Sequence, residues 1–139
     1  MKIDAATGAL EFEAGSLGPA VELEDFLAAP LAGSATVSLH NGPWITYDIR
    51  ADEAWPMSVV FESGRLTEVR LVRVTPGEIG ADWTEAGELS RKRAHDAWLH
   101  EQLGVRRSRF PWGSVESVYD PKALCSNIVV RYSPGRAER

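Results

Sequence analysis

The sequence predicts an α+β fold: an antiparallel sheet of about eight strands, arranged as four hairpins, packed against one long helix, with one additional short helix. Two observations lead to this prediction. Apolar and polar residues alternate in four segments that are interrupted by glycine, proline and asparagine, which is typical of hairpins. A single run, Asp82 to Leu103, is long and regular enough for a full-length helix. At 139 residues the chain has the size of one domain, which is expected to span residues 1–139.

The long helix is expected to begin and end at capping residues. Asp82 is a suitable N-cap with Glu85 three residues later, and Gly104 is a natural residue for the C-terminal stop. At about 100° per residue, mostly small side chains form one narrow stripe that would let the helix approach the sheet closely, with Trp83 and Trp98 filling the space beside it. The stripe consists of Ala86, Ser90, Ala94, Ala97 and Glu101.

The first predicted hairpin spans Met1 to Glu13. A four-residue loop, residues 5–8, sets Ile3 opposite Leu10 and places a glycine where the chain can take a positive φ. Farther along, residues 21–27 predict one or two turns of short helix. Three of its side chains are expected to face the core: Leu23, Phe26 and Leu27.

The second predicted hairpin spans Thr36 to Arg50 and contains Asn41-Gly42, the strongest short hairpin motif in the chain. A two-residue turn would leave the apolar residues of the two strands on different faces, so a five-residue loop, residues 40–44, is preferred. That loop puts Trp44 at the hairpin tip, either tucked under a neighbouring loop or exposed as a contact residue. The resulting pairs on the buried face are Leu39 with Ile45 and Val37 with Tyr47.

The third predicted hairpin spans Asp52 to Val74. A three-residue loop, residues 62–64 with Gly64 left-handed, collects the apolar side chains on one face. That core face consists of Trp55, Met57, Val59, Phe61, Thr67, Val69 and Leu71. The opposite face is expected to meet solvent and carries Ser58, Glu68, Arg70 and Val72.

The fourth hairpin follows the long helix. Residues 105–113 lack periodicity and are expected to be irregular, and the last two strands are predicted at 114–119 and 127–132. Asp120-Pro121-Lys122 opens the long connection between them.

Composition limits the class of protein. The formal net charge is −5; residues 1–63 carry ten acidic and two basic side chains, a net −8, and residues 64–139 carry ten acidic and thirteen basic ones, a net +3. These charges either decorate solvated faces or steer a basic partner. Net acidity argues against nucleic acid as a ligand, and no apolar run approaches membrane length. The single Cys125 and the absence of a signal-peptide core near Met1 favour the cytoplasm.

The sequence contains no motif whose spacing requires a particular chemistry. His95 and His100 are five positions apart on the helix and cannot share a metal ion as an i, i+4 pair would. Cys125 has no histidine placed beside it, and no phosphate-binding glycine loop is present. We therefore predict no catalytic residue, no metal site and no cofactor, and the sequence favours a protein that is not an enzyme.

Aromatic residues are concentrated near the end of the chain, in Phe110-Pro111-Trp112-Gly113 and Ser117-Val118-Tyr119-Asp120. Aromatic side chains are the usual anchors of protein interfaces. One interpretation is a partner-binding surface formed by Trp112, Tyr119 and Asp120, with Trp44 as a further contact residue. The alternative is that Phe110 and Trp112 close the end of the sheet.

At these residues the chain resembles a family of small uncharacterised bacterial proteins. The resemblance rests on the helix sequence AHDAWL and on a closing PWG, YDPK and Tyr block, and it extends over nearly the whole chain. It implies a fold and no catalytic residues. In size, charge and architecture the chain is also similar to the immunity proteins of bacterial toxin systems.

The leading functional prediction is a non-enzymatic protein-binding module, an immunity-type inhibitor whose partner is a basic toxin domain. The alternative is a small-molecule-binding or hydrolytic domain with a pocket between the sheet and the long helix.

Overall fold

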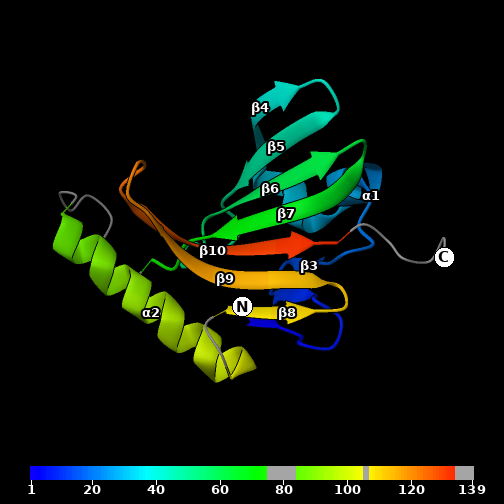
Figure 1. Cartoon of the computed structure of the whole chain (residues 1–139). Coiled ribbons are helices and arrows are strands. Elements are labelled where there is room, and N and C mark those ends of the chain that lie inside the picture. Colours follow the sequence, from blue (N-terminus) through cyan, green and yellow to red (C-terminus); the bar gives the residue numbers. More distant parts are fainter. Residues whose placement is uncertain (75–83, 105–106, 134–139) are drawn as a thin grey trace.

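The computed structural model describes residues 1–74, 84–104 and 107–133, and its main element is a seven-stranded antiparallel sheet (Figure 1). The order of strands is β4-β5-β6-β7-β10-β9-β8, so β7 and β10 pair although they lie far apart in the chain. The predicted α+β class is confirmed, although the described residues form ten strands in two sheets instead of about eight in one. The large sheet contains β4 (Thr36–Asn41), β5 (Trp44–Ile49), β6 (Met57–Glu62), β7 (Arg65–Leu71), β8 (Arg107–Phe110), β9 (Gly113–Asp120) and β10 (Cys125–Tyr132).

A small sheet at the N-terminus contains β1 (Lys2–Ile3), β2 (Leu10–Phe12) and β3 (Gly15–Leu17). The predicted first hairpin is confirmed, because Ile3 pairs with Leu10 and Gly8 has a φ of 80°. The third strand was not predicted from the sequence, where glycine and serine obscure the alternation.

One face of the large sheet, here called the inner face, is covered at one end by α1 (Leu23–Ala28) and the 3₁₀ helix η1 (Pro30–Ser34). Phe26 is buried there, with its ring centroid 5.6 Å from that of Tyr47 and 5.1 Å from that of Phe61. The short helix is thus confirmed. The expectation that Leu27 faces the core is wrong, because one helical step of about 100° turns it from the buried side of Phe26 toward solvent.

The long helix α2 (Glu85–Leu103) covers the other end of the inner face, and Figure 1 shows it near β8 and β9, far from the β4–β5 hairpin. Its predicted C-terminal stop is confirmed: Gly104 is left-handed, with a φ of 83°, and its N–H donates to the carbonyl of His100 at 2.8 Å. Its N-cap is Thr84, whose Oγ1 accepts a hydrogen bond from the Gly87 N–H at 2.9 Å. The predicted N-cap, Asp82, is therefore wrong, and it lies with Trp83 outside the described residues.

The face of α2 that meets the sheet is also not the predicted one. The predicted stripe of Ala86, Ser90, Ala94, Ala97 and Glu101 is exposed. The buried residues are Glu88, His95, Trp98 and Leu99. Two of these four are polar and are held by hydrogen bonds, which is why apolar periodicity pointed to the wrong side of the helix.

The β4–β5 hairpin differs from its prediction. Asn41 pairs with Trp44, so the turn has two residues and not five. A β-bulge between Val37 and Leu39 shifts the register, so Val37 lies opposite Tyr47 as predicted whereas Leu39 lies opposite Thr46. All six residues of β4 are exposed, because β4 is an edge strand and no described element covers it.

The β6–β7 hairpin uses the same combination of a short turn and a bulge. Gly64 is left-handed as predicted, but the turn is the two-residue Ser63-Gly64, with φ values of 50° and 82°. A shift at Thr67 puts Val59 opposite Val69, so the two side chains share one face as predicted. The predicted core is confirmed except that Leu66 takes the place of Thr67: the other members, Trp55, Met57, Val59, Phe61, Val69 and Leu71, are buried.

The last two predicted strands are confirmed as β9 and β10, which pair along their whole length. Part of the stretch predicted to be irregular, residues 105–113, forms β8, which pairs with β9 and closes the sheet at that edge.

Candidate functional site

Side chains pack in the layer between α2 and the sheet, which is where the alternative functional prediction placed a pocket. The rings of Trp98 and Trp55 lie 4.8 Å apart between their centroids. Glu88 fixes the first turns of the helix to β10, because its Oε1 accepts from the Ser126 N–H at 3.0 Å and its carbonyl accepts from the Ser126 hydroxyl at 2.8 Å. These contacts pack the layer around Trp98 and Glu88. A pocket of about 420 Å³ nevertheless lies between the start of α2 and the start of β10, where the alternative prediction expected one, and it is lined by Val72, Glu88, Arg91, Ala123, Leu124, Cys125 and Ser126.

His95 is the most deeply buried polar group in this layer. Its Nε2 accepts a hydrogen bond from the backbone N–H of Arg73 at 3.1 Å, and its Nδ1 has no hydrogen-bond partner among the described residues. Burial, together with the positive charge of Arg91, lowers the pKa of His95 from 6.5 to about 4. The imidazole is thus neutral at pH 7 and serves as a buried acceptor that joins the helix to the chain after β7.

The opposite face of the large sheet, here called the outer face, is not covered by any described helix. Strand alternation places on it the residues between the core positions of each strand. A hollow of about 640 Å³ lies on this face across β4 to β7 and β10. We call it the Trp44 hollow, and it is lined by Ser38, Leu39, Asn41, Trp44, Thr46, Ser58, Val60, Thr67, Glu68, Arg70, Arg131 and Tyr132.

One end of the Trp44 hollow is apolar. Trp44 is 42% exposed at the start of β5, and Leu39 on the edge strand is 59% exposed. The bulge in β4 is what brings Leu39 to this face, because it pairs with Thr46 of the outer face and not with Ile45 of the inner face. Large exposed apolar side chains gathered at one place mark interaction surfaces more often than isolated ones do.

The other end of the hollow carries a ladder of charges on three neighbouring strands. Arg131 of β10 lies directly across from Glu68 of β7, and its Nε donates to Glu68 Oε1 at 3.1 Å. Arg70, two residues after Glu68 on the same face, donates from Nε to Oε2 of that carboxylate at 2.6 Å. The Nη1 of Arg131 also donates to Glu116 of β9 at 3.1 Å. One carboxylate therefore holds two guanidinium groups in fixed positions.

Three of the hydroxyl groups that line the Trp44 hollow donate hydrogen bonds within the sheet. Ser58 donates to Asp48 Oδ1 at 2.8 Å, Thr67 donates to the Val60 carbonyl at 3.2 Å, and Ser38 donates to the Thr46 carbonyl at 3.3 Å. These hydroxyls are committed as donors to the protein itself. What the hollow offers a ligand is therefore apolar surface at one end and guanidinium donors at the other.

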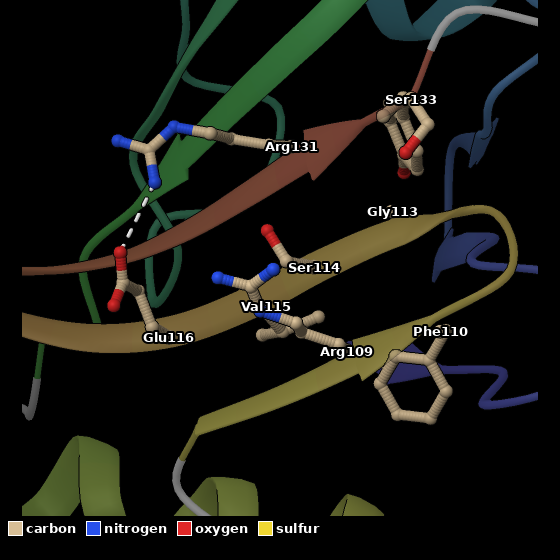
Figure 2. Close-up of a pocket in the computed structure, with 9 residues that line it drawn as sticks. Arg109, Phe110, Gly113, Ser114, Val115, Glu116, Arg131 and Ser133 are labelled. Atoms are coloured by element: carbon tan, nitrogen blue, oxygen red, sulfur yellow. Dashed lines mark hydrogen bonds and ion pairs between the residues drawn. The ribbon is translucent and has the colours of Figure 1, made fainter.

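A second hollow of about 440 Å³ adjoins the first along Arg131 and Tyr132 and extends the outer face to β8 (Figure 2). Figure 2 shows Arg131 of β10 reaching to Glu116, and Arg109 of β8 extending over the face of β9 near Ser114. The two hollows together are lined by three arginines and two glutamates. The lining of the two hollows is thus slightly positive in a chain that is acidic overall.

The four contact residues predicted from the sequence do not form one surface. Trp112 is only 9% exposed: its Nε1 donates to the Ala5 carbonyl at 2.9 Å and its ring stacks on Phe110 at 4.8 Å. A Cβ at position 8 would lie 2.4 Å from the indole, so Gly8 is needed for this contact. Trp112 thus packs between Phe110 of the large sheet and the N-terminal loop, whereas the alternative interpretation placed it at the end of the sheet.

Tyr119 and Asp120 lie at the β9–β10 hairpin tip, away from the Trp44 hollow. The pKa of Tyr119 is raised by desolvation and by Glu85 and Glu88 of α2, so its hydroxyl lies toward the helix side of the sheet. Asp120 accepts hydrogen bonds from the backbone N–H groups of Lys122 and Ala123 at 2.9 and 3.3 Å, which stabilises the turn. Of the four predicted residues, only Trp44 lines the Trp44 hollow.

Among the described residues no group of three or more potential ligands could hold a metal ion. No helix in the described part of the chain is long and apolar enough to cross a membrane.

The fold is shared with a chain of the solved complex of Rhs1-CT with its cognate immunity protein RhsI1. The two chains are 18% identical, the TM-score is 0.58, and the alignment covers 99% of this chain and 92% of the other. No family model and no curated protein matches the sequence. The structural likeness therefore establishes the fold, and the resemblance to small bacterial proteins rests on the quoted motifs alone.

Some of the residues that form the two hollows were predicted from the sequence, and others were not. Glu68 and Arg70 were correctly predicted to share a solvent-facing side, and Trp44 was named as a contact residue. Arg131 and Glu116 were missed because the β7–β10 pairing brings Arg131 to Glu68 and the β9–β10 pairing brings Glu116 close to Arg131. The one indication in the sequence was the strict alternation of Ile128, Val130 and Tyr132, which places Arg131 on the opposite face.

Proposed function

We propose that this chain is a non-enzymatic protein-binding module that acts as an immunity-type inhibitor of a bacterial toxin. The observation that carries the proposal is the fold, which extends over 99% of the chain and is shared with a chain from a complex that contains an immunity protein. An inhibitor of this kind needs a stable scaffold and an exposed recognition surface, and it needs no catalytic group of its own.

The outer face supplies a surface of the required kind. Tryptophan and arginine are the residues most enriched at the energetically dominant positions of protein interfaces, and both line the Trp44 hollow. We assign Trp44 to the interface. Trp112 is buried, Tyr119 lies on the helix side of the sheet, and Asp120 stabilises a turn. In this proposal these three residues belong to the scaffold and not to the interface.

The partner is proposed to be a toxin domain that meets this chain in the cytoplasm. The acidic N-terminal half, net −8 over residues 1–63, would accelerate association with a basic domain by long-range attraction. Neither nucleic acid nor a membrane is part of the proposal.

The experiment begins with a pull-down of the tagged chain from a lysate of its native cells. The recovered partner is then expressed in a bacterial host with and without this chain. We expect the partner domain alone to stop growth and co-expression of this chain to restore it. A partner encoded by the neighbouring gene would be consistent with this result.

Two outcomes contradict the proposal. One is a partner whose toxicity is not relieved by this chain although the two proteins bind. The other is recovery of a metabolic enzyme encoded in a metabolic operon, which would favour the small-molecule or hydrolytic alternative.

A further inference from the structure

We propose that the Trp44 hollow binds a partner segment in which an apolar side chain lies beside a carboxylate: the apolar side chain packs on Trp44 and Leu39, and the carboxylate binds Arg70 and Arg131. This inference rests on the proposed function, because it names the chemistry of the toxin surface that the module recognises.

The apolar end sets the first requirement. Trp44 and Leu39 expose large apolar surfaces on the same side of the sheet, and Val60 lies between the strands that carry them and the charged end. The hydroxyl groups of Ser38 and Thr67 donate to the backbone carbonyls of Thr46 and Val60 and are not free donors to a ligand. A partner side chain gains here mainly by removing apolar area from water.

The charged end sets the second requirement. The side chains of Arg70 and Arg131 are 57% and 52% exposed, whereas Glu68, which holds both of them, is only 15% exposed. An approaching partner thus meets guanidinium groups before it meets the carboxylate beneath them. A guanidinium has five N–H donors; Arg70 uses Nε and Arg131 uses Nε and Nη1 in the contacts described, so donors remain for a second carboxylate.

The ladder also explains why this end is suited to binding and not only to solubility. Long arginine side chains lose rotamer freedom when they bind a partner, and this loss weakens binding. Glu68 and Glu116 hold Arg131 in place before any partner arrives, so much of that ordering already exists in the free protein. Pre-ordered guanidinium groups favour a planar, bidentate acceptor such as a carboxylate.

Charge complementarity distinguishes a carboxylate from the alternatives. A lysine or arginine of the partner would face three arginines against two glutamates across the two adjoining hollows. A nucleic-acid phosphate would suit the guanidinium groups but would approach a chain of net charge −5, which disfavours a polyanion. A single carboxylate on a partner that is basic elsewhere complements both the arginines of the hollow and the net negative charge of the chain.

The first test uses a small probe and requires no partner. Phenylacetate combines an apolar ring with a carboxylate, and phenylacetamide is its neutral analogue. In nitrogen-proton NMR spectra of the whole chain, we expect millimolar phenylacetate to shift the Trp44 indole N–H and the Nε–H signals of Arg70 and Arg131. Phenylacetamide should shift them at least several-fold less, and Arg131→Gln should remove the difference. Equal shifts with both probes, or no shift with either, would overturn the proposal.

The second test uses the toxin domain identified by the growth experiment. Arg131→Gln and Trp44→Ala should each raise the Kd at least tenfold, whereas Arg93→Gln, an exposed arginine on α2, should leave it within twofold. Thermal unfolding of each variant checks that the fold is retained. If the wild-type chain relieves toxicity but Arg131→Gln binds like wild type, this inference fails and the proposed function stands. If the wild-type chain relieves no toxicity, the proposed function fails, and the probe experiment alone decides the chemistry of the hollow.

Discussion

The two faces of the large sheet are built from alternate residues of the same strands, yet they serve different purposes. On the inner face Val59, Phe61 and Val69 are fully buried beneath α1, α2 and the N-terminal strands. On the outer face their neighbours Val60, Glu68 and Arg70 line an open hollow. A side chain's contribution to stability thus depends on which face the strand register gives it. The inner face provides stability, and the outer face is left uncovered by the described helices.

The outer face can remain uncovered because it satisfies its own polar groups. The glutamate and arginine ladder and the internally bonded hydroxyls leave Trp44 and Leu39 as the large exposed apolar side chains in the hollow. Covering such a face with a partner would remove apolar area from water without leaving the ladder unpaired. This balance is what a protein must have if it is to be soluble alone and also bind a partner.

Phe61→Ala and Val60→Ala test this contrast at adjacent positions. Phe61 is fully buried, so its truncation leaves a cavity and is expected to lower the free energy of unfolding by about 3–5 kcal/mol. Val60 faces the outer hollow, so its truncation should cost less than about 1.5 kcal/mol. Urea unfolding followed by fluorescence measures both values. Similar costs at the two positions would mean that the two faces are not distinct.

The inner face could be predicted from the sequence and the exact turns could not. Alternation identifies Met57, Val59 and Phe61 as one face. A shift of the strand register by one residue would move these apolar side chains to the solvent side, so burial of the face excludes it. For both hairpins the sequence analysis placed the change of register in a longer loop, whereas the chain uses a two-residue turn with a bulge at Ser38 or Thr67. Beyond the turn, the longer loop and the turn with a bulge place the same apolar side chains on the same face, so apolar patterning cannot distinguish the two.

The buried side of α2 could not be predicted for a different reason. Its contacts with the sheet include Glu88 and His95, which a pattern of apolar residues assigns to solvent. The charged ladder of the outer face was partly hidden too, because Glu68 and Arg131 are 63 residues apart in sequence. Alternation in the sequence predicts which face of the sheet a side chain lies on. Its neighbours on that face depend on the order of the strands, which alternation does not predict.

The buried His95 makes the stability of the inner layer depend on pH. Its pKa in the folded protein, about 4, is below the usual 6.5, so the unfolded chain takes up a proton more readily as the pH falls. Stability is complete above pH 6.5 and declines from there down to about pH 4. The contribution of this one group to the loss is about 3 kcal/mol. Its charged neighbours Arg73, Arg91 and Lys92 favour the neutral ring, and Asp96 opposes them.

The measurement compares wild type with His95→Gln by urea unfolding at a series of pH values from 7.5 to 4. Glutamine keeps an acceptor for the Arg73 N–H and does not titrate in this range. Carboxylates contribute equally to both curves, so the difference between the curves isolates the imidazole. Parallel curves would show that His95 is protonated as easily in the folded protein as in the unfolded chain.

The smallest expected effect concerns the outward side of α2, where the sequence pattern and the structure disagree most directly. If the stripe of small residues faced the sheet, Ala94→Leu would overpack the core and cost about 1–3 kcal/mol. The structure places Ala94 in solvent and Leu99 in the core, so we expect Ala94→Leu to change the free energy of unfolding by less than about 0.5 kcal/mol. Leucine is nearly as good a helix former as alanine, so helix propensity leaves this expectation unchanged.

Leu99→Ala is the matched variant on the same helix and should cost about 2–5 kcal/mol. Urea unfolding of both variants at pH 7 decides between the two orientations of the helix. A large loss of stability at Ala94 together with a small loss at Leu99 would show that the side of the helix with the small residues faces the sheet.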